Sequence, residues 1–397
     1  MFAAVCALGI TQITAWGTSY YCLGVLAGPI ARDTGWSGGL IYFGFTVGVL
    51  TMGAVSAWAG RAIDRHGARA VMSAGALLVS TGLVALSQVR SETAYLAVWA
   101  FIGLGMRLSL YDAAFAALVQ VVPSRGRRAI SYLTLFGAFA SSVFWVLGHF
   151  FNEALGWRQT LVIFAAINLC ICLPLNWFGL SRREPAAAGE GAAGESQAAR
   201  SDPPLAGRRR SVALGLFALV MSVNGFVFGV ITVQLVPLLQ AAGLTAAAAV
   251  WVASMKGFAQ FAGRLVEIVF GRNLHVMTIA RMAIGVLPVS FLLLLFADGN
   301  FLAILAFTLV MGAAQGVITI VRGAVPLALF GVTGYGGVLG LIATPVLIVS
   351  AASPTLFALI IERWSWQSAQ AVLVAAAATS WFAMELMSRW YERNRKT

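Results

Sequence analysis

Apolar stretches that are each long enough to cross a bilayer follow one another along nearly the whole chain. A transmembrane helix needs about 20 mostly apolar residues. Only 10% of this sequence is charged, whereas an ordinary soluble protein has about 25%. The chain is therefore predicted to be an all-α membrane protein with twelve transmembrane helices. The predicted spans are 1–30, 38–59, 70–89, 94–119, 129–151, 158–180, 211–239, 246–266, 275–297, 301–325, 336–360 and 367–389.

Basic side chains concentrate in alternate loops. The loops after even-numbered spans and the C-terminal tail contain Arg61, Arg65, Arg69, Arg125, Arg127, Arg128, Arg393, Arg395 and Lys396. Basic loops remain on the cytoplasmic side of a membrane, so both termini are expected in the cytoplasm of a bacterial cell, with the spans in its inner membrane. The net charge of +12 then reflects topology and does not indicate nucleic-acid binding.

One long segment lacks the apolar pattern. Residues 181–210 are rich in Ala, Gly, Pro, Glu and Arg and show no hydrophobic periodicity, which is typical of disorder. We expect a flexible cytoplasmic linker that divides the spans six and six. The expected parts are an N-terminal bundle at 1–180, a C-terminal bundle at 211–389 and a cytoplasmic tail at 390–397.

The two halves repeat each other in sequence. The segment Tyr95–Phe101 (YLAVWAF) matches Phe301–Phe307 (FLAILAF), and Gly60-Arg61-x-x-Asp64 matches Gly263-Arg264-x-x-Glu267. Repeats of this kind indicate two bundles of related structure.

The loop at residues 60–69 (GRAIDRHGAR) is the first dense cluster of charge. Its spacing resembles the signature between helices 2 and 3 of the major facilitator superfamily (MFS). The matching residues are Gly60, Asp64, Arg65, Gly67 and Arg69. The resemblance implies an MFS fold of two pseudo-symmetric six-helix bundles, a substrate site at the midplane and rocker-switch alternating access. It further implies a monomeric secondary transporter in the lipid bilayer, with no cofactor.

Several charged residues lie towards the expected cytoplasmic ends of the helices. Ion pairs at such positions can stabilise one transport state and break in the next. We expect this gating role for the signature loop, with Asp64 near the Gly-rich start of span 11, and for Arg264, Glu267 and Arg322.

Two cations lie near the middle of predicted spans, Arg107 in span 4 and Lys256 in span 8. Ionisable residues at this depth usually face a cavity or a partner. A guanidinium and an ammonium together could bind a small carboxylate; the alternative is an ion pair that only ties helices together. A basic residue on helix 8 is similar to one in oxalate/formate and monocarboxylate carriers, although the basic residues of those carriers on helices 1 and 11 are absent here.

Polar and aromatic side chains accompany these cations. Gln12, Trp16 and Tyr20 follow at i, i+4 and i+8 and so share one helix face, which suits either a ligand pocket or hydrogen bonds between helices. Further candidates for substrate binding are Asn224, Gln260 and Gln315.

Asp112 is the best-placed acid for proton coupling. It follows Arg107 by five residues, which in an unbroken helix places the two side chains about 140° apart. We therefore expect no direct pair on one helix, and instead a partner on another helix or a proton site.

The favoured function is transport of a small organic anion. Coupling of this transport to protons is left open. The alternative is an efflux permease for a toxic or amphipathic molecule. Against drug efflux, span 5 lacks a Gly-Pro pair and span 1 lacks an acid. An enzyme is disfavoured because the three histidines are dispersed and no metal-ligand spacing appears. The sequence also has no P-loop, so we expect transport that is not driven by ATP. A sensor with a transporter fold is a further alternative.

Overall fold

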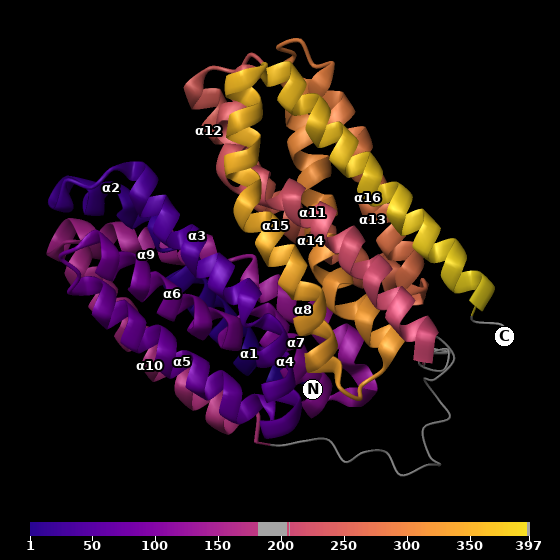
Figure 1. Cartoon of the computed structure of the whole chain (residues 1–397), viewed down its shortest axis with the longest axis horizontal. Helices are drawn as coiled ribbons and strands as arrows, with labels where there is room; N and C mark the ends of the chain where they lie inside the picture. The colour runs from indigo at the N-terminus through magenta and orange to yellow at the C-terminus, as the bar shows by residue number, and fades with distance from the viewer. Residues whose placement is uncertain (182–204, 206, 395–397) are drawn as a thin grey trace. The chain divides into compact units, whose positions relative to one another are not determined.

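The computed structural model describes residues 1–181, 205 and 207–394, and these form helices with no strand among them (Figure 1). The first part of the chain contains α1 (Phe2–Ala15), η1 (Trp16–Tyr20), α2 (Leu23–Thr34), α3 (Gly38–Ala54), α4 (Ser56–His66), α5 (Ala68–Ser87), α6 (Glu92–Ser109), α7 (Tyr111–Val121), η2 (Pro123–Arg125), α8 (Gly126–Gly137), α9 (Ala140–Leu155) and α10 (Trp157–Gly179). The later part contains α11 (Gly207–Ala241), α12 (Ala246–Phe270), η3 (Gly271–Asn273), α13 (Val276–Leu295), α14 (Phe301–Phe330), α15 (Tyr335–Arg363) and α16 (Trp366–Asn394).

Among the described residues, nine helices are long and apolar enough to cross a membrane, and the bent pair α3 and α4 makes a tenth. The predicted spans 1–30 and 246–266 are also helical but are not among these ten. The first is divided into α1, η1 and α2, and the second carries polar side chains such as Lys256 and Gln260. The all-helical membrane fold is confirmed, and the count of twelve spans stays a prediction.

The chain forms two compact units. Unit 1 comprises Met1–Ala188 and Val332–Thr344, and unit 2 comprises Gly189–Gly331 and Pro345–Thr397. The start of α15 thus packs with the N-terminal helices, although the sequence placed it in the C-terminal bundle.

The end of the expected linker and the start of the expected tail differ from expectation. Residues 207–210 of the expected linker already belong to α11, and the expected tail begins inside α16, which continues to Asn394. Arginine is a good helix former, and basic residues in a last helical turn interact favourably with the helix dipole. Most of the expected linker, at 182–204 and 206, lies outside the described residues.

Within unit 1, α5 packs against α6 and α10, and α3 packs against α6. Gly103 of α6 lies directly on the carbonyl of Gly48 in α3, where a Cβ atom would have no room. Small residues of this kind allow membrane helices to approach closely. The hydroxyl of Tyr95, fully buried beside them, donates a 2.8 Å hydrogen bond to the Ile41 carbonyl.

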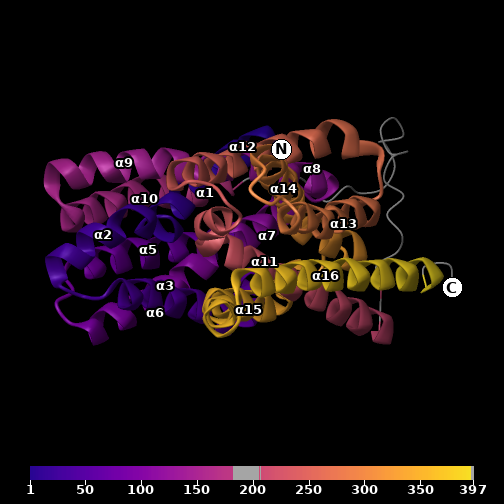
Figure 2. The same ribbon diagram turned by 90° about the horizontal axis from the view of Figure 1, so that it is seen from above.

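Within unit 2, α14 packs against α12 and α13, and α16 packs against α13 and α11. The two long helices α11 and α16 run side by side (Figures 1 and 2). Asn224 of α11 donates a 2.6 Å hydrogen bond to Ser380 Oγ of α16. Arg281 of α13 forms a bidentate pair with Glu385 of α16, with both distances at 2.8 Å.

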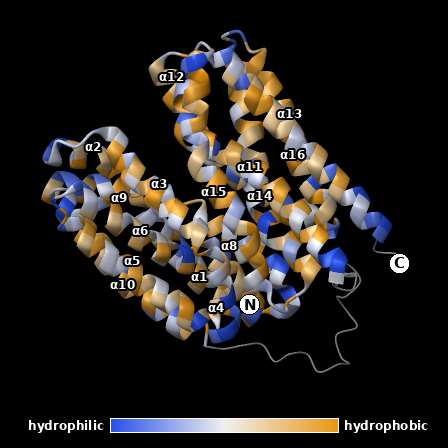
Figure 3. Cartoon of the chain, viewed as in Figure 1, coloured by the Kyte–Doolittle hydropathy of each residue, from blue (hydrophilic) through white to orange (hydrophobic). Residues whose placement is uncertain are grey.

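Many helices carry exposed large apolar side chains, and Figure 3 colours long stretches of these helices as hydrophobic. Phe178, Phe258 and Phe382 are each about 70% exposed. Such surfaces are stable only against lipid. The protein is therefore an integral, multi-pass membrane protein.

Candidate functional site

The fourth predicted span is broken near its middle, where α6 ends at Ser109 and α7 begins at Tyr111. Leu110 between them is extended, with φ −81° and ψ −170°. Ala113 would donate to the Ser109 carbonyl in an unbroken helix but donates instead to Leu110. Gln12 of α1 supplies the missing partner, with its Nε2 atom 2.8 Å from the Ser109 oxygen.

The break brings Arg107 and Asp112 together, with 3.3 Å between Nη1 and Oδ2. Their side chains are only 2% and 7% exposed, and Arg107 Nε donates a 2.5 Å hydrogen bond to Ser56 Oγ of α4. The prediction that these two residues would not pair directly was wrong. It assumed a continuous helix, and the extended residue Leu110 changes the rotation between α6 and α7.

Gln12, Trp16 and Tyr20 do lie together, as their spacing predicted. Trp16 Nε1 donates to Gln12 Oε1 at 3.2 Å, and the rings of Trp16 and Tyr20 are 4.8 Å apart. The helix is locally a π-helix at Trp16–Tyr20, a distortion that is often found at functional sites. Tyr111, which the sequence did not single out, adds a ring 5.1 Å from Trp16.

Lys256, in the unbroken helix α12, has a different environment. Its ammonium lies 5.7 Å from the ring centre of Phe228 in α11, a cation–π contact. The side chain is half-buried. Within the described part of the chain, no acidic side chain forms an ion pair with it.

Gln260 and Gln315 belong to the same packed pair of helices. Gly312 and Gly316 of α14 lie on the backbone of Lys256 and Gln260 in α12, which places Gln315 beside this stretch. The Oε1 atom of Gln315 is buried and has no hydrogen-bond partner among the described residues. Asn224, in contrast, uses its amide nitrogen for a hydrogen bond between α11 and α16. This bond links two helices, which is the alternative to binding a ligand.

The signature loop contacts the start of α15 within unit 1. The carboxylate of Asp64 accepts hydrogen bonds from Gly336 N at 2.9 Å and Gly337 N at 2.6 Å. An acid at a helix N-terminus is stabilised by the unpaired backbone N–H groups there. Gly60 lies on the Gly336 carbonyl with no room for a side chain, and Gly67, with φ +82°, ends α4.

Arg65 and Arg69, two of the three arginines in the signature loop, have separate surroundings. Arg69 places its guanidinium 4.1 Å from the ring centre of Trp177. Arg65 is exposed and lines a pocket of about 360 Å³ together with Asp64, Gln120 and Tyr335.

The remaining gating candidates lie in unit 2. Arg264 and Glu267 are 4% and 7% exposed and lie one turn apart on α12. Arg264 Nε donates a 3.4 Å hydrogen bond to the Gly316 carbonyl of α14. Arg322, further along α14, is half-buried.

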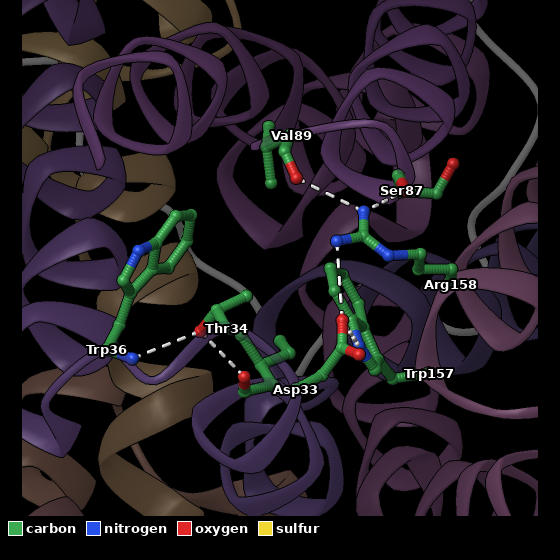
Figure 4. A network of polar contacts seen from close by, with 8 residues as sticks. Asp33, Thr34, Trp36, Ser87, Val89, Trp157 and Arg158 are labelled. Atoms are coloured by element: carbon green, nitrogen blue, oxygen red, sulfur yellow. Dashed lines mark hydrogen bonds and ion pairs between the residues drawn. The ribbon is translucent and has the colours of Figure 1, made fainter. Parts of the chain in front are cut away.

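One polar network in unit 1 was not predicted from the sequence. Asp33 accepts hydrogen bonds from Trp157 Nε1 at 3.0 Å and from Arg158 Nη2 at 3.3 Å (Figure 4). Arg158 Nη1 also donates to the carbonyls of Ser87 and Val89. The network joins the end of α2, the end of α5 with the residues that follow it, and the start of α10. The adjacent residues Trp157 and Arg158 were the only signal, and their partners lie far away in sequence.

The sequence of this chain is similar to a known protein family and to a bacterial protein. The sequence profile of the Major Facilitator Superfamily matches residues 8–289. The multidrug resistance protein MdtL of Escherichia coli is 28% identical over 184 residues, which are 46% of this chain and 46% of MdtL. The match thus spans less than half the length of that relative.

Solved structures extend the likeness in fold to nearly the whole chain. The human organic anion transporter MFSD10 (TETRAN) has a TM-score of 0.75 at 17% identity, over 96% of this chain and 99% of that one. The transporter FucP in the outward conformation has a TM-score of 0.72 at 15% identity, over 96% and 98%. The profile covers most of the chain, and together with the helical membrane fold and the signature loop it shows that the chain belongs to the Major Facilitator Superfamily.

Proposed function

We propose that this protein is a secondary active transporter that moves a small organic anion, carboxylate-like in chemistry, by rocker-switch alternating access. It acts as a monomer in a bacterial inner membrane, with both termini in the cytoplasm. The observation that carries the proposal is Lys256, a mid-span ammonium with no carboxylate partner among the described residues.

A cation at this depth needs a compensating charge, because desolvating an unpaired ion is costly. A substrate carboxylate would supply that charge at Lys256. The neighbouring Gln260 and Gln315 would orient the bound anion, since the unsatisfied Gln315 Oε1 can accept a hydrogen bond from a hydroxyl or amino group of the ligand. The aromatic ring of Phe228 would form an apolar wall.

The buried pair of Arg107 and Asp112 suits a coupling role. While Asp112 is ionised, it neutralises Arg107, and the guanidinium is not available to an anion. Protonation of Asp112 would remove this compensation, and Arg107 could then bind the substrate carboxylate. Transport of the anion would thereby be linked to a proton. Gln12, Trp16 and Tyr20, which surround the same broken helix, would complete the binding surface, and Asn224 would support it from α11.

The signature loop suits gating. The bonds from Asp64 to the start of α15 would be made in one transport state and lost in another. Gly60 permits this close approach, and Gly67, with its positive φ, ends α4. The same or the equivalent contacts would be stabilised by Arg65, Arg69, Arg264, Glu267 and Arg322.

The test is a thermal-shift screen of the purified protein against small carboxylates, with Arg107→Ala and Lys256→Ala alongside. A ligand that binds the folded state raises the melting temperature in a dose-dependent way. We expect a carboxylate to stabilise the wild type and both variants to lose the shift. Arg90→Ala, at an exposed loop position, is the matched control and should keep it.

A second candidate is efflux of a toxic or amphipathic molecule. The cluster of Trp16, Tyr20 and Tyr111 favours it, as does the similarity to a protein named for multidrug resistance. If neutral or cationic amphiphiles alone shift the melting temperature, and the Lys256 variant responds like the wild type, this candidate replaces the anion transporter.

A further inference from the structure

Arginines gather at one end of unit 2, where α11 begins and α16 ends. Arg209 Nη1 of α11 donates a 3.1 Å hydrogen bond to the carbonyl of Asn394 in α16, so the two helix ends lie at the same level. Figure 3 shows the end of α16 as hydrophilic, next to apolar turns.

On α16, exposed apolar residues lead directly to exposed arginines. Phe382 and Leu386 are 69% and 53% exposed, and Arg389 and Arg393 are also exposed. Their spacings of four, three and four residues place all four on one helix face. This face therefore passes from a lipid-facing surface to a cationic one within about three turns.

The start of α11 repeats this arrangement in the opposite chain direction. Arg208, Val212, Gly215 and Leu219 are all exposed, and their spacings of four, three and four residues again define one face. Because α11 packs against α16, the two faces belong to neighbouring helices.

The nearby acids do not neutralise this cluster. Arg281 of α13 binds Glu385 through two hydrogen bonds and lies 3.7 Å from Glu392. Arg389 shares Glu385 at 3.3 Å. Among the described residues, no acidic partner pairs with Arg208, Arg210 or Arg393. The end of unit 2 thus carries a clear excess of positive charge.

We propose that this end of unit 2 binds an anionic phospholipid. The headgroup phosphate is held by the arginines of α11 and α16, and the acyl chains lie along Leu219 and Phe382. Arginine forms bidentate, charge-assisted hydrogen bonds to phosphate, and basic residues beside a transmembrane helix attract anionic lipids. This site is distinct from the proposed substrate site and does not depend on the transported molecule.

Native mass spectrometry of the full chain with added phosphatidylglycerol or phosphatidylcholine tests the proposal. We expect selective retention of phosphatidylglycerol. Each arginine contributes about fivefold in lipid affinity, so Arg208→Gln with Arg210→Gln should weaken retention by about twentyfold or more. This double variant leaves the ion pairs of Glu385 intact. The double variant Arg389→Gln with Arg393→Gln should lose retention to a similar extent. The control is Arg363→Gln, which changes an exposed arginine at the C-terminal end of α15 and should retain the lipid.

Three results would overturn the proposal. The first is equal retention of the two lipids by the wild type. The second is unchanged selectivity in both double variants. The third is displacement of the lipid by millimolar glycerol phosphate, because a soluble phosphate that competes fully indicates an anion site without acyl-chain contacts.

Discussion

The two mid-span cations differ in what surrounds them. Arg107 in unit 1 is almost fully buried, paired with Asp112 and hydrogen-bonded to Ser56. Lys256 in unit 2 is half-buried, lies over an aromatic ring, and pairs with no acid in the described chain. From the sequence they looked equivalent. One charge is already compensated by a carboxylate, whereas the other has no ion-pair partner among the described residues.

The backbone explains the difference. The break at Leu110 rotates α7 relative to α6 and brings an acid five residues away onto Arg107. Helix α12 is continuous, and its nearest acid, Glu267, is eleven residues from Lys256, or about 16 Å along the axis. Lys256 therefore cannot be neutralised by its own helix.

The largest expected effect follows from removing the negative charge of Asp112, which pairs with Arg107. Asp112→Asn removes the carboxylate that pairs with the buried Arg107 guanidinium, which should cost about 3–5 kcal/mol of stability. The check is the melting temperature of the purified protein. Arg107→Leu combined with Asp112→Leu removes both charges and should recover much of the loss. An Asp112→Asn variant as stable as the wild type would contradict the ion-pair account.

Gln12→Leu tests how the broken span is held. The change leaves the buried Ser109 carbonyl without its donor, at a cost of about 1–3 kcal/mol. Thermal unfolding measures the loss, and Thr46→Val, at a half-buried position on α3, is the comparison variant. If the two variants unfold alike, Gln12 does not stabilise the break.

Lys256→Gln should have little effect on stability, below about 1 kcal/mol, because no ion pair is lost. Its effect should appear in ligand binding, as the loss of the carboxylate-induced thermal shift. A destabilisation as large as that of Asp112→Asn would show that Lys256 has a structural partner, and the contrast between the two units would then fail.

The smallest expected effect is that of Phe228→Leu. Loss of the cation–π contact should cost about 0.5–1 kcal/mol and weaken anion binding only a few-fold. Titration of the thermal shift with the carboxylate provides the measurement. Complete loss of binding would mean that the ring, and not the ammonium, holds the ligand.

The sequence was sufficient for features that depend on local pattern. Helical spacing predicted the shared face of Gln12, Trp16 and Tyr20, and the MFS-like loop predicted that Asp64 lies near the start of span 11. Apolar stretches predicted the helical membrane fold. The shared helix face and the membrane fold depend on residues close in sequence and on hydropathy. The position of Asp64 beside residues 272 positions away came from the resemblance to the family.

The sequence was insufficient where the backbone departs from a regular helix or where distant loops meet. Nothing in Leu108, Ser109 and Leu110 signals a break, because none is Gly or Pro, so the pair of Arg107 and Asp112 was not predicted. The contact of Asp33 with Arg158 joins residues 125 positions apart. Only tertiary packing determines such a contact.

Flux in proteoliposomes tests the central claim most directly. Wild type and Lys256→Gln would be reconstituted in equal amounts and assayed with radiolabelled oxalate, formate and lactate, with and without an inward proton gradient. The account predicts that the wild type accumulates at least one of these anions and that Lys256→Gln, though folded, falls to the level of empty liposomes. Equal uptake by the two proteins, or transport of cationic amphiphiles with no carboxylate moved, would contradict it.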